Sequence, residues 1–424
     1  MNFNHFQDFI ANSPSPYHVS KNIQNKLRDL GFKDIRHFNE VNSTEAFVFV
    51  NNGSVIAYRP GKVPYAQGTR LIGTHTDSPG LKLRPNPIKK IQNYNLLKVE
   101  IYGGPILDTW LDRDLGIAGI CHGSNSEGQF KSFLVNSRNP VGMIPSLAIH
   151  LAKEADKIID RQKDLNPIFS LGYRPDQNWN EIMIESSMIE NYDDKFEVRG
   201  FDLIFYDTHQ PTLIGIDQEL VVSPRLDNLA SVYAALNSFS AVTNPEYSCV
   251  FVSCNHEEIG SQSRTGAAGT FLKDVLVKLS GNADQFAEIM NRSFFMSVDN
   301  AHGIHPSFVA KHDDNHLPLL NGGPVLKYNS SGRYITDSFS GAVARHIAEK
   351  AEVPLQEFSS INTLPCGSTI GPMIAARTGV AGIDVGIPTL GMHSIRESAS
   401  TQDFDYLEAF LKQFISSNIN MESL

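Results

Sequence analysis

Apolar side chains in the first 75 residues follow helical spacing first and strand spacing afterwards. Residues 5–12 and 19–30 repeat them every three or four positions, which predicts two amphipathic helices. The runs EAFVFV and SVIAYRP then flank an Asn-Asn-Gly turn and predict a β-hairpin. The next run, TRLIGTH, predicts a buried strand that ends at His75.

The pattern changes between residues 88 and 220. Short alternating strands such as LLKVEIYG dominate, a helix is predicted over residues 145–159, and residues 177–195 are polar and weakly patterned. We therefore expect an inserted domain, residues 89–220, within a main domain formed by residues 1–88 and 221–424. A length of 424 residues is equally consistent with two or three separate units.

From residue 221 onward, strands and helices alternate. The predicted helices cover residues 227–239, 270–279, 338–350, 369–377 and 404–415, and the predicted strands cover residues 249–254, 294–299 and 381–387. Such alternation indicates an α/β fold with a mixed, mostly parallel sheet flanked by helices. Ligands of such sheets collect beyond the carboxyl ends of the strands.

Composition and charge narrow the possible partners. Lys and Arg number 36 against 46 Asp and Glu, a net charge of −10, and the basic residues are scattered, which argues against a nucleic-acid partner. The sequence has no apolar stretch of membrane-spanning length and no signal-peptide pattern, so we expect no membrane association and a cytoplasmic location. The four cysteines form no Cys-x-x-Cys motif, which excludes thiolate zinc sites and redox motifs of that type.

Five segments place a His, Asp or Glu at a predicted strand or helix end. They are LIGTHTD, SPRLDN, SCNHEEIG, MSVDNAH and TLGMHS. Each residue alone has an ordinary explanation as a helix cap, a hydrogen-bonded histidine or a solvated glutamate. Several carboxylates at one sheet edge, however, repel one another unless a cation or a proton lies between them.

The chemistry of a two-ion site accounts for these residues. Such a site needs one bridging carboxylate and about two further N or O ligands for each ion. Asp227 supplies the bridge, His75 and Asp299 complete one site, and Glu258 and His393 complete the other. Ligands of this kind suit Zn²⁺, with Co²⁺ or Mn²⁺ as substitutes, whereas Ca²⁺ prefers oxygen ligands only.

Two acidic residues beside these ligands have separate expected roles. Glu257 is placed to take a proton from the attacking water and return it to the leaving amine. Asp77, two residues after His75, suits the orientation of a ligating imidazole. The string CGSTIG predicts a turn whose residues 367–369 bring backbone N–H groups near the site, although such turns more often serve chain geometry alone.

The strings GTHTDSPG, TWLDRDL, SPRLDNL, NHEEIGSQS, SVDNAHGIHP, CGSTIGP and MHSIRES occur in this order. Together they resemble the aspartyl aminopeptidase family of metallopeptidases, family M18, in its bacterial form. The resemblance implies a co-catalytic dinuclear zinc peptidase. It matches the family's metal ligands to His75, Asp227, Glu258, Asp299 and His393, and its general base to Glu257.

The resemblance also implies an assembly and a substrate class. The insert becomes a dimerisation domain, and dimers form a homo-oligomeric dodecamer whose narrow entrances admit short peptides. His150 matches a histidine that reaches a neighbouring active site, although an exposed position on an amphipathic helix explains it equally well.

Three further assignments concern the substrate. Lys327 matches the lysine that selects N-terminal Asp or Glu, and His305 matches the histidine that binds the substrate carbonyl; otherwise Lys327 is a surface lysine and His305 a turn residue. Gly367, Ser368 and Thr369 are the expected substrate-binding residues of the CGSTIG turn. We expect an aminopeptidase that prefers acidic N-termini. The alternatives are the same chemistry with a neutral preference and a non-catalytic oligomeric scaffold.

Overall fold

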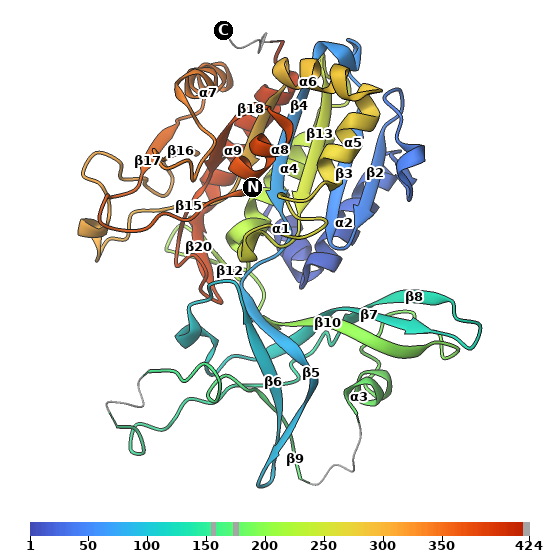
Figure 1. The fold of residues 1–424 in the computed structure, drawn as a ribbon. Helices are drawn as coiled ribbons and strands as arrows, with labels where there is room; N and C mark the ends of the chain where they lie inside the picture. Colours follow the sequence, from blue (N-terminus) through green and yellow to red (C-terminus); the bar gives the residue numbers. More distant parts are fainter. Residues whose placement is uncertain (154–157, 173–177, 419–424) are drawn as a thin grey trace.

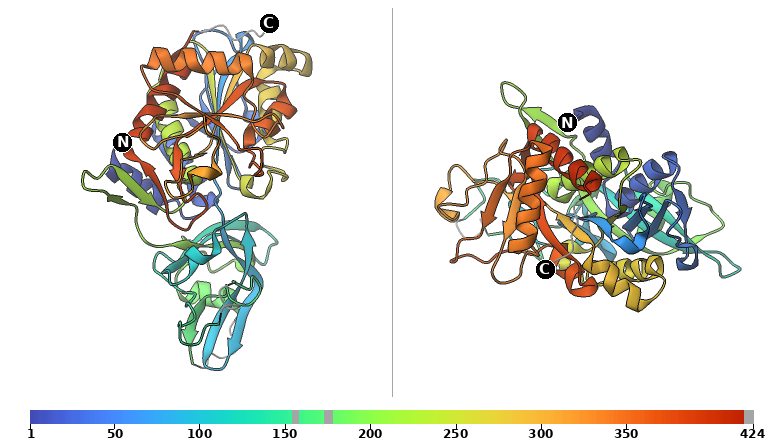
Figure 2. Two further views of the ribbon diagram at one scale, coloured as in Figure 1. Left: turned by 90° about the vertical axis from the view of Figure 1, so that its left-hand side faces the viewer. Right: turned by 90° about the horizontal axis from the view of Figure 1, so that it is seen from above.

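The computed structural model describes residues 1–153, 158–172 and 178–418. It has a larger part in which helices cover a central sheet and a smaller part made largely of strands (Figures 1 and 2). The prediction of an α/β fold with a mixed sheet flanked by helices is confirmed.

The central sheet has nine strands in the order β1-β2-β3-β13-β4-β14-β18-β16-β17. Its four middle strands, β13, β4, β14 and β18, run parallel, while β2 and β3 form the expected hairpin. The bounds are β1 Lys33–Ile35, β2 Phe47–Asn51, β3 Ser54–Arg59, β4 Thr69–His75, β13 Ser248–Cys254, β14 Phe294–Val298, β16 Val325–Tyr328, β17 Gln356–Ser359 and β18 Ala381–Gly386.

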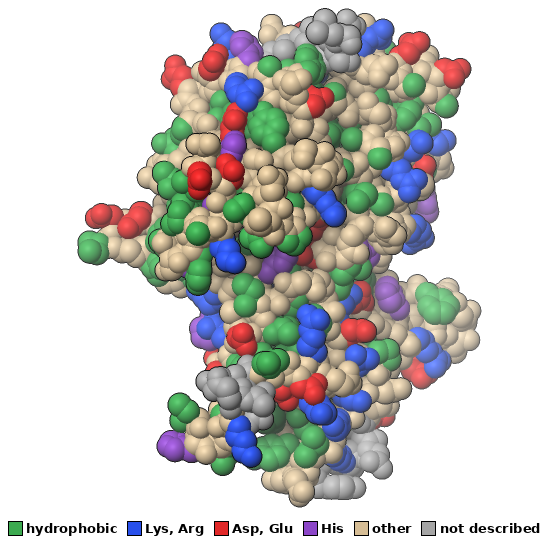
Figure 3. Space-filling view, turned by 60° about the vertical axis from the view of Figure 1, so that its left-hand side comes forward, with side chains coloured by type: hydrophobic (Ala, Val, Ile, Leu, Met, Phe, Trp, Pro, Cys, Tyr) green, Lys and Arg blue, Asp and Glu red, His purple; other side chains and the backbone are tan. Residues whose placement is uncertain are grey.

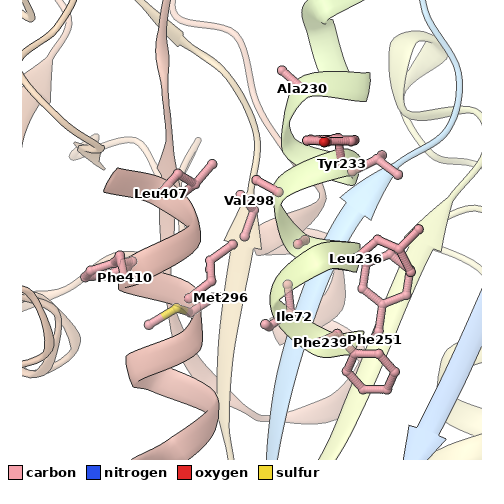
Figure 4. Close-up of a cluster of buried hydrophobic side chains, with 14 of the residues drawn as sticks. Ile72, Ala230, Tyr233, Leu236, Phe239, Phe251, Met296, Val298, Leu407 and Phe410 are labelled. Atoms are coloured by element: carbon pink, nitrogen blue, oxygen red, sulfur yellow. The ribbon is translucent and has the colours of Figure 1, made fainter. Parts of the chain in front are cut away.

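Helices cover both faces of this sheet. One face carries α1 (Phe3–Ala11), α2 (Pro16–Asp29), α4 (Leu226–Ala241), α7 (Ser338–Ala351) and α9 (Thr401–Ser416). The other face carries α5 (Phe271–Ser280), α6 (Ala283–Asn291) and α8 (Ile370–Thr378). Figure 4 shows α4 and α9 beside strands of the central sheet. The buried side chains drawn there include Leu236 of α4, Phe251 of β13 and Met296 of β14. Burial of each such side chain stabilises the fold by roughly 1.5–3 kcal/mol.

The register of the middle strands brings their carboxyl ends to one level. His75 at the end of β4 lies opposite Cys254 at the end of β13. Ser297 of β14 lies opposite Gly73 of β4. Asp299 comes two residues after Ser297, and His75 comes two residues after Gly73, so Asp299 and His75 lie at the same level of the sheet. Polar residues that follow three different strands therefore meet at one edge.

The smaller part is built on an antiparallel six-stranded sheet in the order β8-β7-β10-β5-β6-β9, accompanied by α3 (Trp179–Glu185). The strands are β5 Gly80–Ile91, β6 Tyr94–Tyr102, β7 Leu115–Ser124, β8 Phe130–Asn136, β9 Ile168–Leu171 and β10 Glu197–Asp207. The expected domain boundaries at residues 88 and 220 fall inside β5 and at the start of β12, and they stay a prediction.

A third sheet of five strands links the two parts in the order β11-β12-β20-β19-β15. Its bounds are β11 Thr212–Ile214, β12 Leu220–Ser223, β15 Ala301–His302, β19 Pro388–Leu390 and β20 Glu397–Ser400. The strands β12 and β20 pair directly. This pairing brings the chain before α4 beside the chain after β19.

The helix predicted over residues 145–159 is wrong for residues 145–153, which form extended chain and a turn; residues 154–157 lie outside the described residues. Leu147 and Leu151 are four positions apart, as on one face of a helix, but both are exposed, and so is Ile149 between them. A short helix needs an apolar face that packs against other elements. Without such packing, the periodicity alone does not form a helix here.

The surface combines charges of both signs. On the face shown in Figure 3, Lys and Arg side chains are interspersed with Asp and Glu side chains. Within the described residues, no helix is both long enough and apolar enough to span a membrane.

Candidate metal centre

Five acidic and imidazole side chains converge at the carboxyl edge of the central sheet. They come from the end of β4, the start of α4, the turn after β13, the end of β14 and the loop between β19 and β20: His75, Asp227, Glu258, Asp299 and His393. All five line one cavity of about 280 Å³. The structure thus brings together every metal ligand predicted from the sequence.

Asp227 lies between the two histidines. Its Oδ1 is 3.3 Å from His75 Nε2, and its Oδ2 is 3.4 Å from His393 Nε2. His75 Nε2 is also 3.4 Å from Asp299 Oδ1, and His393 Nε2 is 3.5 Å from Glu258 Oε2. Among the described residues, three groups of three side chains could hold a metal ion. Two of these groups, His75–Asp227–Asp299 and Asp227–Glu258–His393, share the Asp227 carboxylate, and the third combines His75 and Glu258 with Glu257.

Unpaired buried oxygens test whether these residues fit metal ions. Within the described residues, Asp227 Oδ1, Glu258 Oε1 and Asp299 Oδ1 are buried and accept no hydrogen bond. A buried carboxylate oxygen without a partner is costly, and a cation removes that cost. Because the donor atoms are imidazole nitrogens and carboxylate oxygens, the residues fit two Zn²⁺ ions.

The acidic groups hold their protons strongly. Burial, together with the charges of Asp299, Asp77 and Asp227, raises the pKa of Glu257 to about 8. Burial and the charge of Asp227 raise the pKa of Glu258 well above its usual value. Metal ligands bind in their deprotonated form, so cations at this edge would compete with these protons.

For the two histidines, the neighbouring carboxylates outweigh burial and raise the pKa. Although burial lowers it, hydrogen bonding to Asp227 and the charge of Glu258 raise the pKa of His393 to about 10. Burial also opposes protonation of His75, but the carboxylates of Asp227, Asp299 and Asp77 beside its ring raise its pKa. Positive charge is therefore favoured where the two histidines face Asp227.

Asp77 fixes several of these groups at once. His75 Nδ1 lies 3.0 Å from the Asp77 carbonyl oxygen and 3.5 Å from its carboxylate, which leaves Nε2 facing the cluster. The carboxylate accepts the backbone N–H groups of Glu257 and Glu258, both at 3.1 Å, and the Tyr102 hydroxyl at 2.7 Å. Asp77 therefore holds the turn of both glutamates as well as the imidazole.

The loop that carries His393 is held from the smaller part of the molecule. His393 has φ 69°, an uncommon conformation for a residue other than glycine. Its Nδ1 contacts the Gly104 carbonyl oxygen at 3.0 Å, and its own carbonyl accepts the N–H of Ile106 at 2.9 Å. Gly103 has φ 68°, and a Cβ there would lie 3.1 Å from Cβ of Glu258. These contacts leave His393 Nε2 free to face the cluster.

Lys327 lines the same cavity and is only 2% exposed. Its Nζ donates to the carbonyl oxygens of Asp299 at 2.9 Å and Asn300 at 3.1 Å, and it lies 5.2 Å from the centre of the Tyr334 ring. An ammonium group has three N–H donors. The two carbonyls take two of them, and the Asp299 carboxylate lies beside the ammonium as well, with its Oδ2 3.6 Å from Nζ. Lys327 is therefore a buried cation of the site rather than a surface lysine.

Gly367, Ser368 and Thr369 also line the cavity. The Thr369 hydroxyl donates to Asp384 Oδ1 at 2.7 Å and accepts the N–H of Gly371, which fixes the start of α8. The predicted turn residues therefore belong to the wall of this cavity.

His305 and His150 lie apart from the group. His305 Nδ1 accepts the N–H of Ser307 at 3.2 Å, and its ring packs beside Phe308. His150 is exposed in the chain that replaces the predicted helix. Neither residue is part of the cavity lining, which includes His302 instead. Sequence reasoning missed His302 because the two histidines occur in one string, AHGIH, and only the backbone path after Asp299 distinguishes them.

Glu397 is a second residue that sequence reasoning missed. It is buried, and its two oxygens accept the backbone N–H groups of Asp227 at 2.9 Å and His393 at 2.8 Å. Burial and the charge of Asp227 raise the pKa of Glu397 to about 8, and cations bound at Asp227 would oppose that rise. The sequence around Glu397 did not indicate these contacts, because they depend on the pairing of β20 with β12.

Comparison with known proteins agrees with the metal centre described above. The family profile described as "Aminopeptidase I zinc metalloprotease (M18)" matches residues 9–415. The chain is 41% identical to the "Probable M18 family aminopeptidase 2" of Ectopseudomonas mendocina over 420 residues, and 39% identical to the protein of that name from Pseudomonas aeruginosa strain UCBPP-PA14 over 419 residues. Each alignment covers 97% of both chains.

Solved structures are similar over nearly the whole chain. The cryo-EM structure of the Ape4 and Nbr1 complex matches with a TM-score of 0.91 at 33% identity, covering 97% of this chain and 85% of the other. The S. cerevisiae mApe1 dodecamer matches with a TM-score of 0.83 at 27% identity, covering 97% and 95%. The fold and the arrangement of strands are thus shared with these aminopeptidases.

Proposed function

Because the chain belongs to the M18 family of zinc metalloproteases and is a metallo-aminopeptidase, we propose that it is a co-catalytic dinuclear enzyme. It removes N-terminal residues, preferentially Asp or Glu, from short peptides. Two Zn²⁺ ions are its cofactors, with Co²⁺ or Mn²⁺ as substitutes.

One observation carries this proposal: the two oxygens of Asp227 face different imidazoles. A carboxylate between two ligand groups is what a pair of ions roughly 3.5–4 Å apart requires. His75 and Asp299 would hold one ion, Glu258 and His393 the other, and Asp227 both. The bound zinc ions would supply Lewis acidity, which polarises the scissile carbonyl and favours ionisation of water.

Glu257 acts as the general base and acid. It lies beside the ligand Glu258, and its backbone is fixed by Asp77. Bound cations would lower the pKa of Glu257 from about 8 toward neutral pH, where a carboxylate can accept a proton from water and return it to the leaving amine. Asp77 acts as a positioning residue for this turn and for His75.

The cation of Lys327 supports the preference for acidic N-termini. Its Nζ lies in the cavity, 3.6 Å from Asp299 Oδ2. Where a metal ion holds the Asp299 carboxylate, the ammonium would suit a carboxylate of the substrate side chain, against the overall negative charge of the chain. His302 lines the same cavity and takes the substrate-carbonyl role expected of His305. Gly367, Ser368 and Thr369 form the substrate-facing wall.

We further propose a homo-oligomer built from dimers, with twelve chains as the expected number. The similarity to the S. cerevisiae mApe1 dodecamer supports it. Exposed apolar residues of the smaller part, such as Phe130 and Ile149, suit an interface. Contact of His150 with a neighbouring site, and the cytoplasmic location, stay predictions.

Hydrolysis of Asp-, Glu- and Leu-anilides before and after chelation tests the proposal. We expect activity on Asp and Glu anilides that chelation abolishes and added Zn²⁺, Co²⁺ or Mn²⁺ restores. The Lys327→Met variant should lose roughly tenfold or more in kcat/KM for the acidic substrates and little for Leu.

Other outcomes separate the alternatives. Faster cleavage of Leu-anilide by the unmodified enzyme would favour a neutral preference with the same chemistry. The absence of turnover on all three substrates in the metal-loaded protein would favour a non-catalytic scaffold.

A further inference from the structure

Glu397 connects two proposed ligands that are far apart in sequence. It opens β20 and lies opposite Ser223, the last residue of β12. Its Oε2 accepts the N–H of Asp227, and its Oε1 accepts the N–H of His393. One buried carboxylate therefore holds the backbone at the start of α4 and in the β19–β20 loop.

The chemistry of this clamp requires two acceptor atoms. Two backbone N–H donors converge on one side chain, and a carboxylate offers one oxygen to each. A glutamine of the same shape would present an NH₂ group to one of them, so one donor would lose its acceptor. The structure thus explains why an acidic side chain is buried here, 2% exposed, without an ion-pair partner at hydrogen-bonding distance in the described residues.

The clamp acts mainly on one half of the centre. Its two donors belong to Asp227 and His393, whose side chains meet at 3.4 Å and form a ligand group with Glu258. The other half is held separately, because His75 contacts Asp77 and the Asp299 carbonyl accepts from Lys327. Loss of the clamp should therefore affect the two ion positions unequally.

We propose that Glu397 is a positioning residue that sets the affinity of the metal position formed by Asp227, Glu258 and His393. This inference rests on the proposed two-ion function. It predicts that Glu397→Gln binds the ion at Asp227, Glu258 and His393 about 10- to 100-fold more weakly, because two of its ligands lose their anchor, and binds the other ion, which shares only Asp227, with a smaller loss.

A matched control exists in Asp403. Its carboxylate is also buried and accepts two backbone N–H groups, from Asn321 at 2.7 Å and Gly323 at 2.8 Å, but neither donor belongs to a proposed ligand. Asp403→Asn makes the same chemical change in the same type of clamp. It should therefore alter stability without changing the affinity for either ion.

The test is a zinc titration of the full chain after chelation, with bound zinc per chain measured at buffered free-zinc concentrations. We expect two ions of normal affinity in the unmodified protein and in Asp403→Asn, and two ions of clearly unequal affinity in Glu397→Gln. Excess Zn²⁺ should restore the activity of Glu397→Gln, which a loss of general structure would not allow.

Several results would overturn the inference. Two ions of normal affinity in Glu397→Gln would do so, as would an equal weakening of both ions or the same weakening in Asp403→Asn. If the unmodified protein bound no pair of ions, the proposed function itself would fail.

Two further measurements apply if Glu397→Gln does not fold. Glu397→Asp keeps both acceptor oxygens on a shorter side chain, so it should weaken the same ion. Hydrogen exchange of the chelated, unmodified protein provides the other measurement. The amides of Asp227 and His393 should be protected, and exchange as fast as in exposed loops would contradict the clamp.

Discussion

The carboxyl edge of the central sheet buries charged side chains, whereas the outer surface of the smaller part exposes apolar ones. At the sheet edge, Asp227 and Asp299 are 4% and 8% exposed, and each has a carboxylate oxygen without a hydrogen bond. In the smaller part, Phe130, Ile149 and Leu151 are 76%, 82% and 71% exposed. Soluble proteins bury apolar groups and expose charged ones, so both regions indicate a partner from outside the chain.

The two regions differ in how much they say about that partner. Carboxylates and imidazoles are directional ligands, and their distances fit small cations at the two proposed positions. Exposed apolar side chains indicate only that a surface covers them, because the hydrophobic effect has no direction. The metal centre can therefore be described atom by atom, whereas the assembly rests on similarity to relatives.

The largest expected effect comes from removal of the shared carboxylate. Asp227→Ala should lose both ions and all measurable turnover, because each ligand group then lacks a member and the remaining acidic groups repel one another. Metal analysis after gel filtration measures this loss. The exposed Asp217→Ala is the control and should retain both ions; full zinc occupancy in Asp227→Ala would refute the bridge.

Glu257→Gln separates catalysis from metal binding. The variant keeps the shape of the side chain but cannot accept a proton, so kcat should fall by roughly 10²- to 10⁴-fold while zinc content is unchanged. Steady-state kinetics on Asp-anilide with parallel metal analysis provides the readout. A rate near that of the unmodified enzyme would remove Glu257 from the mechanism.

His18 lies outside both regions and shows how much stability burial of a titratable group costs when no group of opposite charge is beside it. Burial, with a smaller contribution from Arg225, lowers the pKa of His18 to about 4, and only its Nδ1 has a partner, the Ser15 hydroxyl. The folded pKa lies below the usual 6.5, so stability is fully present above pH 6.5 and is lost as the pH falls toward 4.

The loss from His18 should reach about 3 kcal/mol at pH 4. Denaturant unfolding of the chelated protein at pH 7 and pH 4 measures it, and His18→Gln should show a smaller difference between the two pH values by about that amount. An identical pH dependence in both proteins would show that His18 is not buried in its neutral form.

The smallest effect per residue is expected at the apolar surface. Ile149→Lys should weaken assembly, since burial of such a side chain contributes at most roughly 1.5–3 kcal/mol. Mass measured by light scattering over a dilution series tests this. Leu30→Lys, at a half-exposed position after α2, is the control, and equal masses for both variants would argue against an interface at Ile149.

The same contrast explains what the sequence could predict. Strand β4 and its terminal His75 were predictable because burial on both faces leaves a continuous apolar run. The carboxyl ends of parallel strands had to meet, which predicted that His75 after β4 and Asp299 after β14 lie near each other. Burial made these patterns informative.

Other features required the three-dimensional path of the chain. In residues 145–153, Leu147 and Leu151 are spaced as on one helix face but remain exposed, so the spacing predicted the wrong element. Helix α6 was missed, and α3 was also missed although Asn178 and Glu181 form a capping box that could have indicated it. His302 and Glu397 act through a turn and a strand pairing that no local pattern encodes.

The most direct test of the account is anomalous X-ray diffraction at the zinc edge from crystals of the zinc-loaded protein. The account predicts two peaks, one on each side of the Asp227 carboxylate, the first beside His75 and Asp299 and the second beside Glu258 and His393. A single peak, or zinc bound elsewhere with Asp227 uninvolved, would contradict the two-ion centre.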